Sequence, residues 1–354
     1  MKKVIEIIQS IKDKINEAEF VSQHKTNPTN FSRKKKLDFE MVFFFVLTMI
    51  KSNLDFDINH FFKNLNVNVV PSAITQRRSQ IQYTAFEEIL KFVGLQMPSE
   101  KTLKGYRVLA IDGMHGELPR YPELMEKYKP HERNGYPQFQ AVSIYDVLNE
   151  FFLCANWDKS PSDERGNASL LIKGENIPQK SIFLFDRLYP SVKLIHLFKE
   201  KNKFLMRVSA ANFFKEVKQF SESSETDSEI TVIYSTRRAN YSGHTAERLG
   251  FKLPCTFNFR CVKIPLKSGE TEVLITNLSS SEFNSKEIGE LYNMRWGIET
   301  SFNYLKNAVN IEMFIGVKEN SIKQEFFSNL IVYSLAKIAA TCAQIKYESK
   351  KNKI

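Results

Sequence analysis

Two aspartates at the ends of apolar segments are the first candidates for chemistry. Asp112 ends the apolar run of residues 106–111, and Asp186 ends the run of residues 181–185. In open α/β sheets sites form at the carboxyl ends of strands, so the two side chains can meet if their strands are neighbours. Paired carboxylates are the hard oxygen ligands that Mg²⁺ and Mn²⁺ prefer. Taken alone, either aspartate is more often an ordinary turn residue than a metal ligand, since Asp-Gly is a common turn sequence.

A third carboxylate, Glu299, lies in residues 287–307, which have helical spacing. At about 100° per residue, Tyr292, Arg295, Glu299 and Lys306 fall within an arc of about 60° on one helix face. That face could bind a metal through Glu299 and phosphates through the other three side chains. The alternative is a solvated face of surface ion pairs. Apolar neighbours predict that this face is partly buried and not solvated, and polar groups tolerate burial only with partners. These neighbours are Met294, Trp296, Ile298, Phe302 and Leu305.

The elements that must position these residues alternate between strand and helix, which predicts an α/β sheet. Besides the two apolar runs, we expect a hairpin of residues 138–145 and 150–155, helices at 162–173 and 191–200, and a strand at 203–208. Residues 210–285 are rich in strand patterns, at 229–234, 255–264 and 272–278, and residues 221–227 form a polar loop. Helical spacing returns at 287–307 and again at 324–347.

Residues 1 to about 100 have helical periodicity throughout, at 4–11, 37–50, 57–65 and 72–93. Residues 72–80 begin one of these helices and offer Thr, Gln and Arg side chains, as a recognition helix does in a DNA major groove. The alternative is a solvated helix face. A short basic run at residues 32–36 lies in the same region.

Composition narrows the class of protein. The chain has 354 residues, of which 42% are hydrophobic, so it is long enough for a sizeable core and is not a disordered protein. Its net charge of +10 favours a polyanionic partner such as nucleic acid. The four scattered cysteines form no CxxC pair, which argues against structural zinc. The most apolar run, residues 41–50, is too short to span a membrane, so we expect a soluble, cytoplasmic protein.

The residues singled out above also carry a resemblance. The spacing Tyr292-x2-Arg295-x3-Glu299-x6-Lys306 matches in full the Y-x2-R-x3-E-x6-K signature of bacterial insertion-sequence transposases of the IS-four family. Asp112 and Asp186 resemble the first and second aspartates of the DDE triad of that family, the second within the segment Phe-Asp-Arg-Leu-Tyr. The β-rich block resembles the insertion of that family, and residues 314–318 and 324–326 resemble its C-terminal region. The resemblance covers about residues 105–345.

Two positions depart from the family pattern. Leu188 stands where a glycine usually follows Asp-Arg, and Met114 with His115 follows the first Asp-Gly, where a small polar residue is common. Neither departure removes a metal ligand. His115 could contact substrate, although a single histidine beside a turn is more often incidental.

The resemblance implies a ribonuclease-H-like mixed sheet flanked by helices, with a β-rich insertion and a helical N-terminal DNA-binding domain. The corresponding domain bounds are 1–100 for the DNA-binding domain, 101–209 for the first part of the core, 210–285 for the insertion and 286–354 for the completion of the core. It also implies a transposase that cleaves DNA at transposon ends and transfers the strands into target DNA.

For the site, the resemblance implies that Asp112, Asp186 and Glu299 hold two Mg²⁺ or Mn²⁺ ions. Arg295 and Lys306 would bind backbone phosphates near the cleaved end, and Tyr292 would support that contact. The implied partners are transposon-end DNA with terminal inverted repeats, target DNA and a second copy of the chain in a homodimer, with no membrane.

Two other functions remain open from the sequence. One is a DNA-binding protein, derived from a transposase, that has lost catalysis; three intact carboxylates argue against it. The other is a metal-dependent DNA nuclease without strand transfer, against which only the resemblance of the signature speaks.

Overall fold

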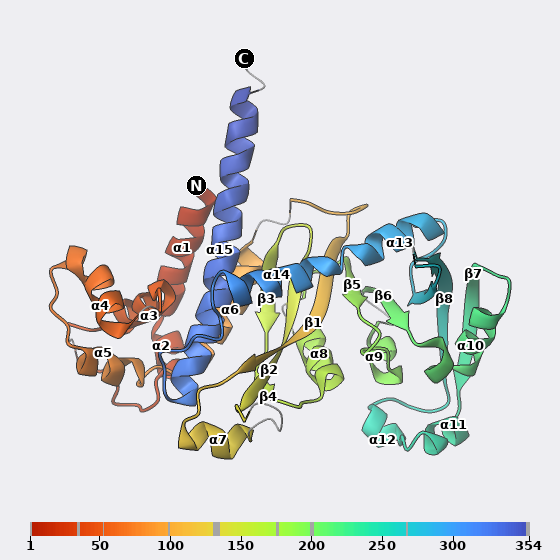
Figure 1. The fold of residues 1–354 in the computed structure, drawn as a ribbon, viewed down its shortest axis with the longest axis horizontal. Coiled ribbons are helices and arrows are strands. Elements are labelled where there is room, and N and C mark those ends of the chain that lie inside the picture. The colour runs from red at the N-terminus through yellow and green to blue at the C-terminus, as the bar shows by residue number, and fades with distance from the viewer. Residues whose placement is uncertain are drawn as a thin grey trace.

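A nine-stranded sheet runs through the molecule, with helices packed against it and a helical lobe at one end (Figure 1). The computed structural model describes residues 2–33, 36–51, 53–97, 100–129, 135–174, 177–198, 202–266 and 268–351. The strand order is β3-β2-β1-β5-β6-β9-β8-β7, with the short β4 (Asp158–Lys159) paired to β2. The site residues predicted from the sequence belong to the central part of this order.

The first five strands in this order form a mixed sheet. The strands β1 (Arg107–Glu117), β2 (Gln138–Asp146) and β3 (Phe151–Ala155) are an antiparallel meander. The next two, β5 (Ser181–Phe185) and β6 (Lys203–Val208), run parallel to β1. Their side chains are almost all buried on both faces, as expected for strands covered by helices. The predicted hairpin and the predicted mixed sheet are confirmed.

The predicted β-rich block extends the same sheet. The strands β9 (Thr271–Thr276), β8 (Cys255–Pro265) and β7 (Asp227–Tyr234) add to β6 one after another, each antiparallel to its neighbour. Arg260 of β8 is buried and donates to the Asp227 carboxylate from Nε at 2.7 Å and from Nη2 at 2.5 Å. This paired charge anchors the outermost strand to its neighbour.

Helices cover the sheet and form the N-terminal lobe. The lobe contains α1 (Lys2–Ile15), α2 (Ala18–His24), α3 (Phe39–Thr48), α4 (Leu54–Phe62), the 3₁₀ turn η1 (Lys63–Leu65), α5 (Pro71–Arg78) and α6 (Thr84–Gln96). Along the sheet follow α7 (Pro122–Tyr128), α8 (Glu164–Lys173), α9 (Val192–Leu197), η2 (Ala210–Asn212), α10 (Lys215–Glu222), α11 (Thr236–Tyr241), α12 (Ala246–Leu249), α13 (Ser285–Asn293), α14 (Trp296–Asn307) and α15 (Glu319–Lys351).

The prediction of one helix across residues 72–93 is wrong, because the chain forms α5 and α6 with a break between them. In the break Ile81 pairs with Lys25 as an isolated β-bridge, and the Gln82 amide donates to the His24 carbonyl at 2.7 Å. These long-range hydrogen bonds to the end of α2 replace the helical ones. Tertiary contacts of this kind override local helix propensity.

The N-terminal lobe is joined to the C-terminal helix by a buried ion pair. Arg78 of α5 donates to Glu325 Oε1 at 2.8 Å and to Gln324 Oε1 at 2.8 Å, and the Glu325 side chain has no exposed surface. Glu325 also accepts from the backbone amides of Ile315 and Gly316 at 3.0 Å and 2.9 Å. Breaking a buried pair typically costs 3–5 kcal/mol, about as much as a large core cavity, so these contacts fix α5 against α15.

The long helix α15 contains a long apolar stretch, Glu319–Ala343. By length and composition alone it could cross a membrane, which the sequence analysis did not anticipate. Half of its most apolar window is buried inside the protein, and it packs against α3, α6 and β3. These contacts explain why α15 is apolar: it is a helix of the protein core.

The first turn of α15 contains a charged cluster whose contribution to stability depends on pH. Glu319 accepts from Lys127 Nζ at 2.5 Å, from the Tyr128 hydroxyl at 2.7 Å and from Lys323 Nζ at 2.7 Å. Although burial opposes ionisation, these contacts lower the pKa of Glu319 from 4.5 to about 2. The stabilisation is therefore fully present above about pH 4.5 and is lost as the pH falls toward 2.

We predict that Glu319→Gln lowers the free energy of unfolding at pH 7 by up to about 3 kcal/mol, and by clearly less at pH 3. Urea unfolding at the two pH values measures both differences. The matched control is Glu290→Gln, because Glu290 is exposed and its ion pair with Lys286 is 3.8 Å long; it should change stability little at either pH. An equal loss for Glu319→Gln at both pH values would contradict the ionic origin of the stabilisation.

Candidate catalytic site

The pairing of β1 with β5 brings Asp112 and Asp186 side by side. The two strands are parallel, and Ile111 is in register with Phe185. The next residue on each strand is therefore an aspartate. The expectation that Asp112 lies just past the end of its strand is wrong, because β1 continues to Glu117 through pairing with β2. Only β5 stops at this point, so Asp112 lies inside β1 but at the edge that β5 leaves open.

The signature segment occupies two helices, not one. Between α13 and α14 the amides of Arg295, Gly297 and Ile298 each donate to the carbonyl three residues earlier, at 3.0, 2.9 and 3.2 Å. Three-residue hydrogen bonds tighten and turn the chain. The prediction of one continuous helix across residues 287–307 is wrong because the two halves pack on different strands, α13 on β8 and α14 on β1.

Arg295, at this turn, lies between two of the predicted carboxylates. Its Nη1 atom is 2.5 Å from Glu299 Oε1 and 3.9 Å from Asp112 Oδ2. The Arg295 side chain is only 6% exposed. One buried guanidinium therefore connects Glu299 on α14 with Asp112 on β1, and Asp186 lies within electrostatic range of both Asp112 and Arg295.

The electrostatics of Asp112 reflect this crowding of carboxylates. Burial raises the pKa of Asp112 from 3.8 to about 6. The neighbouring charges of Glu299 and Asp186 add to the rise, whereas the Gly113 amide, which donates to Asp112 at 2.9 Å, and Arg295 oppose it. A site in which carboxylates are buried close together favours a bound cation, because a positive charge offsets both burial and repulsion.

The donor set fits divalent ions that share their coordination with a substrate. Within the described parts of the chain, no three His, Cys, Asp or Glu side chains are arranged to hold one ion by themselves. Mg²⁺ is usually held by one or two carboxylates together with water and substrate phosphates, not by a complete protein cage. The hard oxygens of Asp112, Asp186 and Glu299 have the chemistry for such binding, and Arg295 now lies among them.

The other signature residues are placed differently from one another. Tyr292 is buried, and its hydroxyl has no hydrogen-bond partner; the same is true of Arg295 Nε. Lys306 lies at the far end of α14, where Nζ donates to the His115 carbonyl at 2.6 Å and is 3.0 Å from Glu312 Oε1. The structure thus brings Tyr292 and Arg295 to the carboxylates and fastens Lys306 to β1.

Glu164, a fourth carboxylate near the site, was missed by the sequence analysis. A Cβ atom on Gly113 would be 3.0 Å from the Glu164 carboxylate, so Glu164 of α8 lies directly against the backbone beside Asp112. It accepts a short hydrogen bond from Gln140 Nε2 and is 3.6 Å from His115 Nε2. The His115 hydrogen bond is the leading cause that lowers the pKa of Glu164. Only the acidic start of a predicted helix signalled it in the sequence, and that feature is common.

The two departures from the family pattern have structural explanations. Leu188 is 60% exposed and has no positive φ angle, so its position does not require glycine. Met114 is buried in the core on β1, in register with Ala141. His115 is not isolated, because its Nδ1 lies 3.1 Å from the Ser160 hydroxyl on the side away from Glu164.

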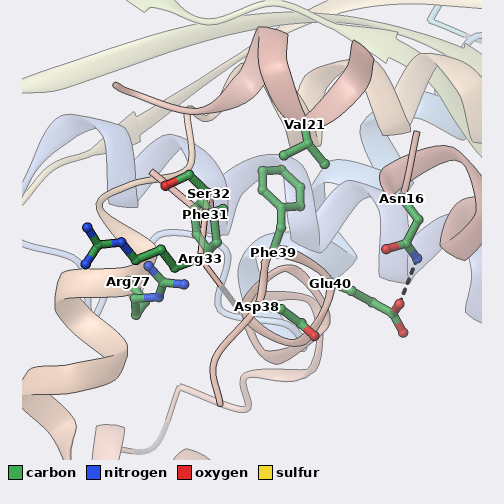
Figure 2. Close-up of a pocket in the computed structure, with 9 residues that line it drawn as sticks. All are labelled: Asn16, Val21, Phe31, Ser32, Arg33, Asp38, Phe39, Glu40 and Arg77. Carbon is green, nitrogen blue, oxygen red and sulfur yellow. Dashed lines mark hydrogen bonds between the residues drawn. The ribbon is translucent and has the colours of Figure 1, made fainter. Parts of the chain in front are cut away.

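The suggestion that residues 72–80 offer arginines to DNA is wrong for both arginines. Arg77 donates to the Leu37 carbonyl and stacks 4.2 Å from the Phe31 ring, beside the pocket in Figure 2. Arg78 is buried in the ion pair with Glu325. The exposed polar side chains of α5 are Ser72, Thr75 and Gln76. Neither arginine is free to contact DNA, because Arg77 binds within the lobe and Arg78 binds α15.

The mixed sheet thus places two aspartates side by side at the end of β5, and α14 brings Glu299 toward them through Arg295. The family model "Transposase DDE domain" matches residues 103–335. The chain therefore belongs to the transposase DDE-domain family, and its enzyme class is that of the DDE transposases.

Proteins similar in sequence to this chain are also named as transposases. The chain is 22% identical to "Transposase InsG for insertion sequence element IS4" of Escherichia coli (strain K12) over 325 residues, which are 86% of this chain and 70% of that protein. It is 32% identical over 94 residues to "Putative transposase y4zB" of Sinorhizobium fredii, covering 27% of this chain and 25% of that protein. "Putative transposase InsZ" of Escherichia coli (strain K12) is 28% identical over 139 residues, 37% of this chain and 46% of that protein. Two of these alignments thus span less than half of the relative.

Among solved structures, the chain resembles the piggyBac transposase in its "synaptic complex with hairpin DNA". The TM-score is 0.50 at 13% sequence identity, and the match covers 94% of this chain and 76% of that one. At this identity the likeness concerns the fold alone. It confirms the predicted ribonuclease-H-like sheet.

The close contact between Gly113 and Glu164 generates a stability prediction. Gly113→Ala places a methyl group against a carboxylate that Gln140 and His115 hold, so we expect a loss of about 1–3 kcal/mol in the free energy of unfolding. Gly297→Ala is the matched control, because its nearest neighbour would be 3.5 Å away, an ordinary contact. Alanine should there stabilise α14 by up to about 1 kcal/mol. If urea unfolding gave the same small gain for both variants, the tight contact would be excluded.

Proposed function

We propose that this transposase cleaves DNA at the ends of its element and joins the ends to target DNA, with Asp112, Asp186 and Glu299 as metal-binding carboxylates. The observation that carries the proposal is the parallel register of β1 and β5, which makes two aspartates neighbours. Arg295 ties Glu299 to the same place. Three carboxylates from three distant parts of the chain lie close together, which is not expected if the aspartates are ordinary turn residues.

Two divalent ions, Mg²⁺ or Mn²⁺, would supply charge stabilisation for the attacking and leaving oxygens of an in-line displacement. The side chains of the protein would hold these ions and orient the DNA. Asp112 lies inside β1, where β2 pairs with it on one side and β5 leaves the other side open. Asp186 follows directly from a buried strand, whereas Glu299 reaches in from α14 and is 30% exposed.

We assign Tyr292, Arg295 and Lys306 to the DNA. The Tyr292 hydroxyl and Arg295 Nε are donors without a partner in the structure, and an incoming phosphate would satisfy such donors. The side chain of Lys306 is 36% exposed and can exchange its surface partner Glu312 for a phosphate. Arg supplies a planar fork and Lys a point charge, both of which suit the backbone near a cleaved end.

The proposed partners follow from the family and the charge. The net charge of +10 suits a polyanion, and terminal inverted repeats and target DNA are the substrates that transposition requires. We assign binding of the repeats to residues 1–100, with catalysis in residues 101–209 and 286–354 and the insertion at 210–285. A homodimer would bring two element ends together.

For the carboxylates, we predict that Asp112→Ala, Asp186→Ala and Glu299→Ala each abolish cleavage and joining but leave DNA binding largely intact. Each removes charge stabilisation worth several kcal/mol. The assay incubates purified protein with inverted-repeat DNA and Mn²⁺ and reads cut and joined products separately. The control Glu290→Ala removes an exposed carboxylate of α13 and should retain both activities. Strong residual cutting by one variant would remove that residue from the triad, and cutting without joining would favour the nuclease.

A second prediction separates Arg295 from the carboxylates. Arg295→Lys keeps a positive charge near Glu299 but loses the planar fork of arginine. We therefore expect it to bind the cleaved DNA end more weakly than the natural protein but more tightly than Arg295→Ala. Titration of end DNA against each variant measures capture, and Lys306→Ala should lower the slope of log affinity against log salt by about one contact. Normal end binding by Arg295→Ala would exclude the phosphate contact.

A further inference from the structure

Tyr189 is a buried tyrosine whose hydroxyl has been left without a partner beside the candidate site. It belongs to the turn after β5, where its amide donates to the Asp186 carbonyl at 3.1 Å. Its side chain is 1% exposed, and the hydroxyl makes no hydrogen bond of ordinary geometry. The hydroxyl nevertheless lies within electrostatic range of the carboxylates of Asp112, Glu164 and Asp186. It is thus a buried proton donor in the neighbourhood of three carboxylates.

The backbone of β1 provides the space for this arrangement. Successive residues of a strand point to opposite faces, so Asp112 faces α14 and Gly113 faces α8. Gly113 has no side chain, and the Glu164 carboxylate approaches to 3.0 Å from the position that a Cβ atom would take. A carboxylate from α8 therefore reaches the back of the strand at the residue next to Asp112.

The helix α8 holds the turn after β5 as well as the strand β1. Glu164 is fixed by the short hydrogen bond from Gln140 and by the nearby His115 ring. The next residue, Arg165, donates from Nε to the Leu188 carbonyl at 2.6 Å, one residue before Tyr189. Adjacent residues at the start of α8 thus contact both segments that carry the aspartates. The helix begins there because the Asp163 side chain caps it.

We propose that Tyr189 is a positioning residue for Asp112 and Asp186, with Glu164 holding its hydroxyl in place from the α8 side of the sheet. This inference rests on the proposed function of the carboxylates as metal ligands. The hydroxyl has one proton, which it donates either to Glu164 or to an aspartate; in the proposed role it goes to an aspartate, and the neighbouring Glu164 carboxylate limits where the hydroxyl can move. Groups that orient metal-binding side chains from the second layer commonly change metal affinity by about 10–100-fold.

The unfavourable environment of the hydroxyl supports a functional role. A buried donor without a partner destabilises a fold, and phenylalanine would fill the same space without that penalty. The ring already packs on Phe185 with 5.7 Å between centroids, so packing requires only the ring. Burial and the surrounding carboxylates hold the pKa of Tyr189 well above its usual value, so the hydroxyl keeps its proton and remains a donor.

The test measures Mn²⁺ binding by electron paramagnetic resonance, together with thermal melting, on full-length protein. We expect Tyr189→Phe to raise the dissociation constant for Mn²⁺ about tenfold while the metal-free melting temperature stays unchanged or rises. Glu164→Gln should weaken Mn²⁺ binding similarly, and the double variant should bind no worse than the weaker single variant, because the two residues act through one hydroxyl. The matched control is Tyr234→Phe, which removes another buried tyrosine hydroxyl, bonded to His244 at 2.8 Å, and should leave Mn²⁺ affinity unchanged.

Asp112→Ala separates this inference from the proposed function. If the natural protein binds Mn²⁺, Asp112→Ala does not, and both Tyr189→Phe and Glu164→Gln bind as tightly as the natural protein, the positioning role is overturned while the carboxylate site stands. A lower melting temperature with unchanged Mn²⁺ affinity would likewise overturn it, because that is the signature of a purely structural residue. If Asp112→Ala bound Mn²⁺ as well as the natural protein, the metal-site assignment would fail, and the role of Tyr189 with it.

Discussion

The parallel pairing of β1 with β5 is the constraint on which the rest of the site depends. A shift of one residue in this register would turn one aspartate to the opposite face of the sheet, because side chains alternate. The register is fixed by buried apolar side chains on both strands, from Val108 and Ile182 to Ile111 and Phe185. Core packing therefore sets the position of the carboxylates, and β1 can extend past them only because β2 supplies a second partner.

Concentrating carboxylates in one place creates an electrostatic cost that Arg295 offsets. Its guanidinium contacts Glu299 directly and lies near Asp112, at a turn where α13 gives way to α14. A continuous helix would have kept one direction along the sheet, whereas the turn lets each half pack on its own strands. The buried cation lies at the break in the helix, and it offsets only part of the negative charge of Asp112, Asp186 and Glu299.

The sequence predicted those features that depend on local periodicity and on residue type. Apolar runs located β5 and β6, and the spacing of the signature identified Arg295 and Glu299 as neighbours. Features that depend on long-range contacts were missed: the extension of β1 beyond Asp112, the break between α5 and α6, and the burial of Arg77 and Arg78. The position of Glu164 behind Gly113 was equally hidden, because no spacing in the chain relates a residue at the start of α8 to a glycine of β1.

The distribution of unsatisfied polar groups ties stability to function. Among the described residues, buried side-chain atoms without hydrogen-bond partners include Ser143 Oγ, Tyr189 Oη, Tyr292 Oη and Arg295 Nε. Ser143 is in register with Asp112, and the other three surround the carboxylates. Buried polar atoms without partners destabilise a fold. Other described residues, such as Lys51 and Asn329, also have such atoms, but these four lie near the candidate carboxylates or on the strand paired with Asp112. A ligand that satisfied them would add its binding free energy to the stability of the fold, so we expect the proposed ions and DNA to stabilise the protein.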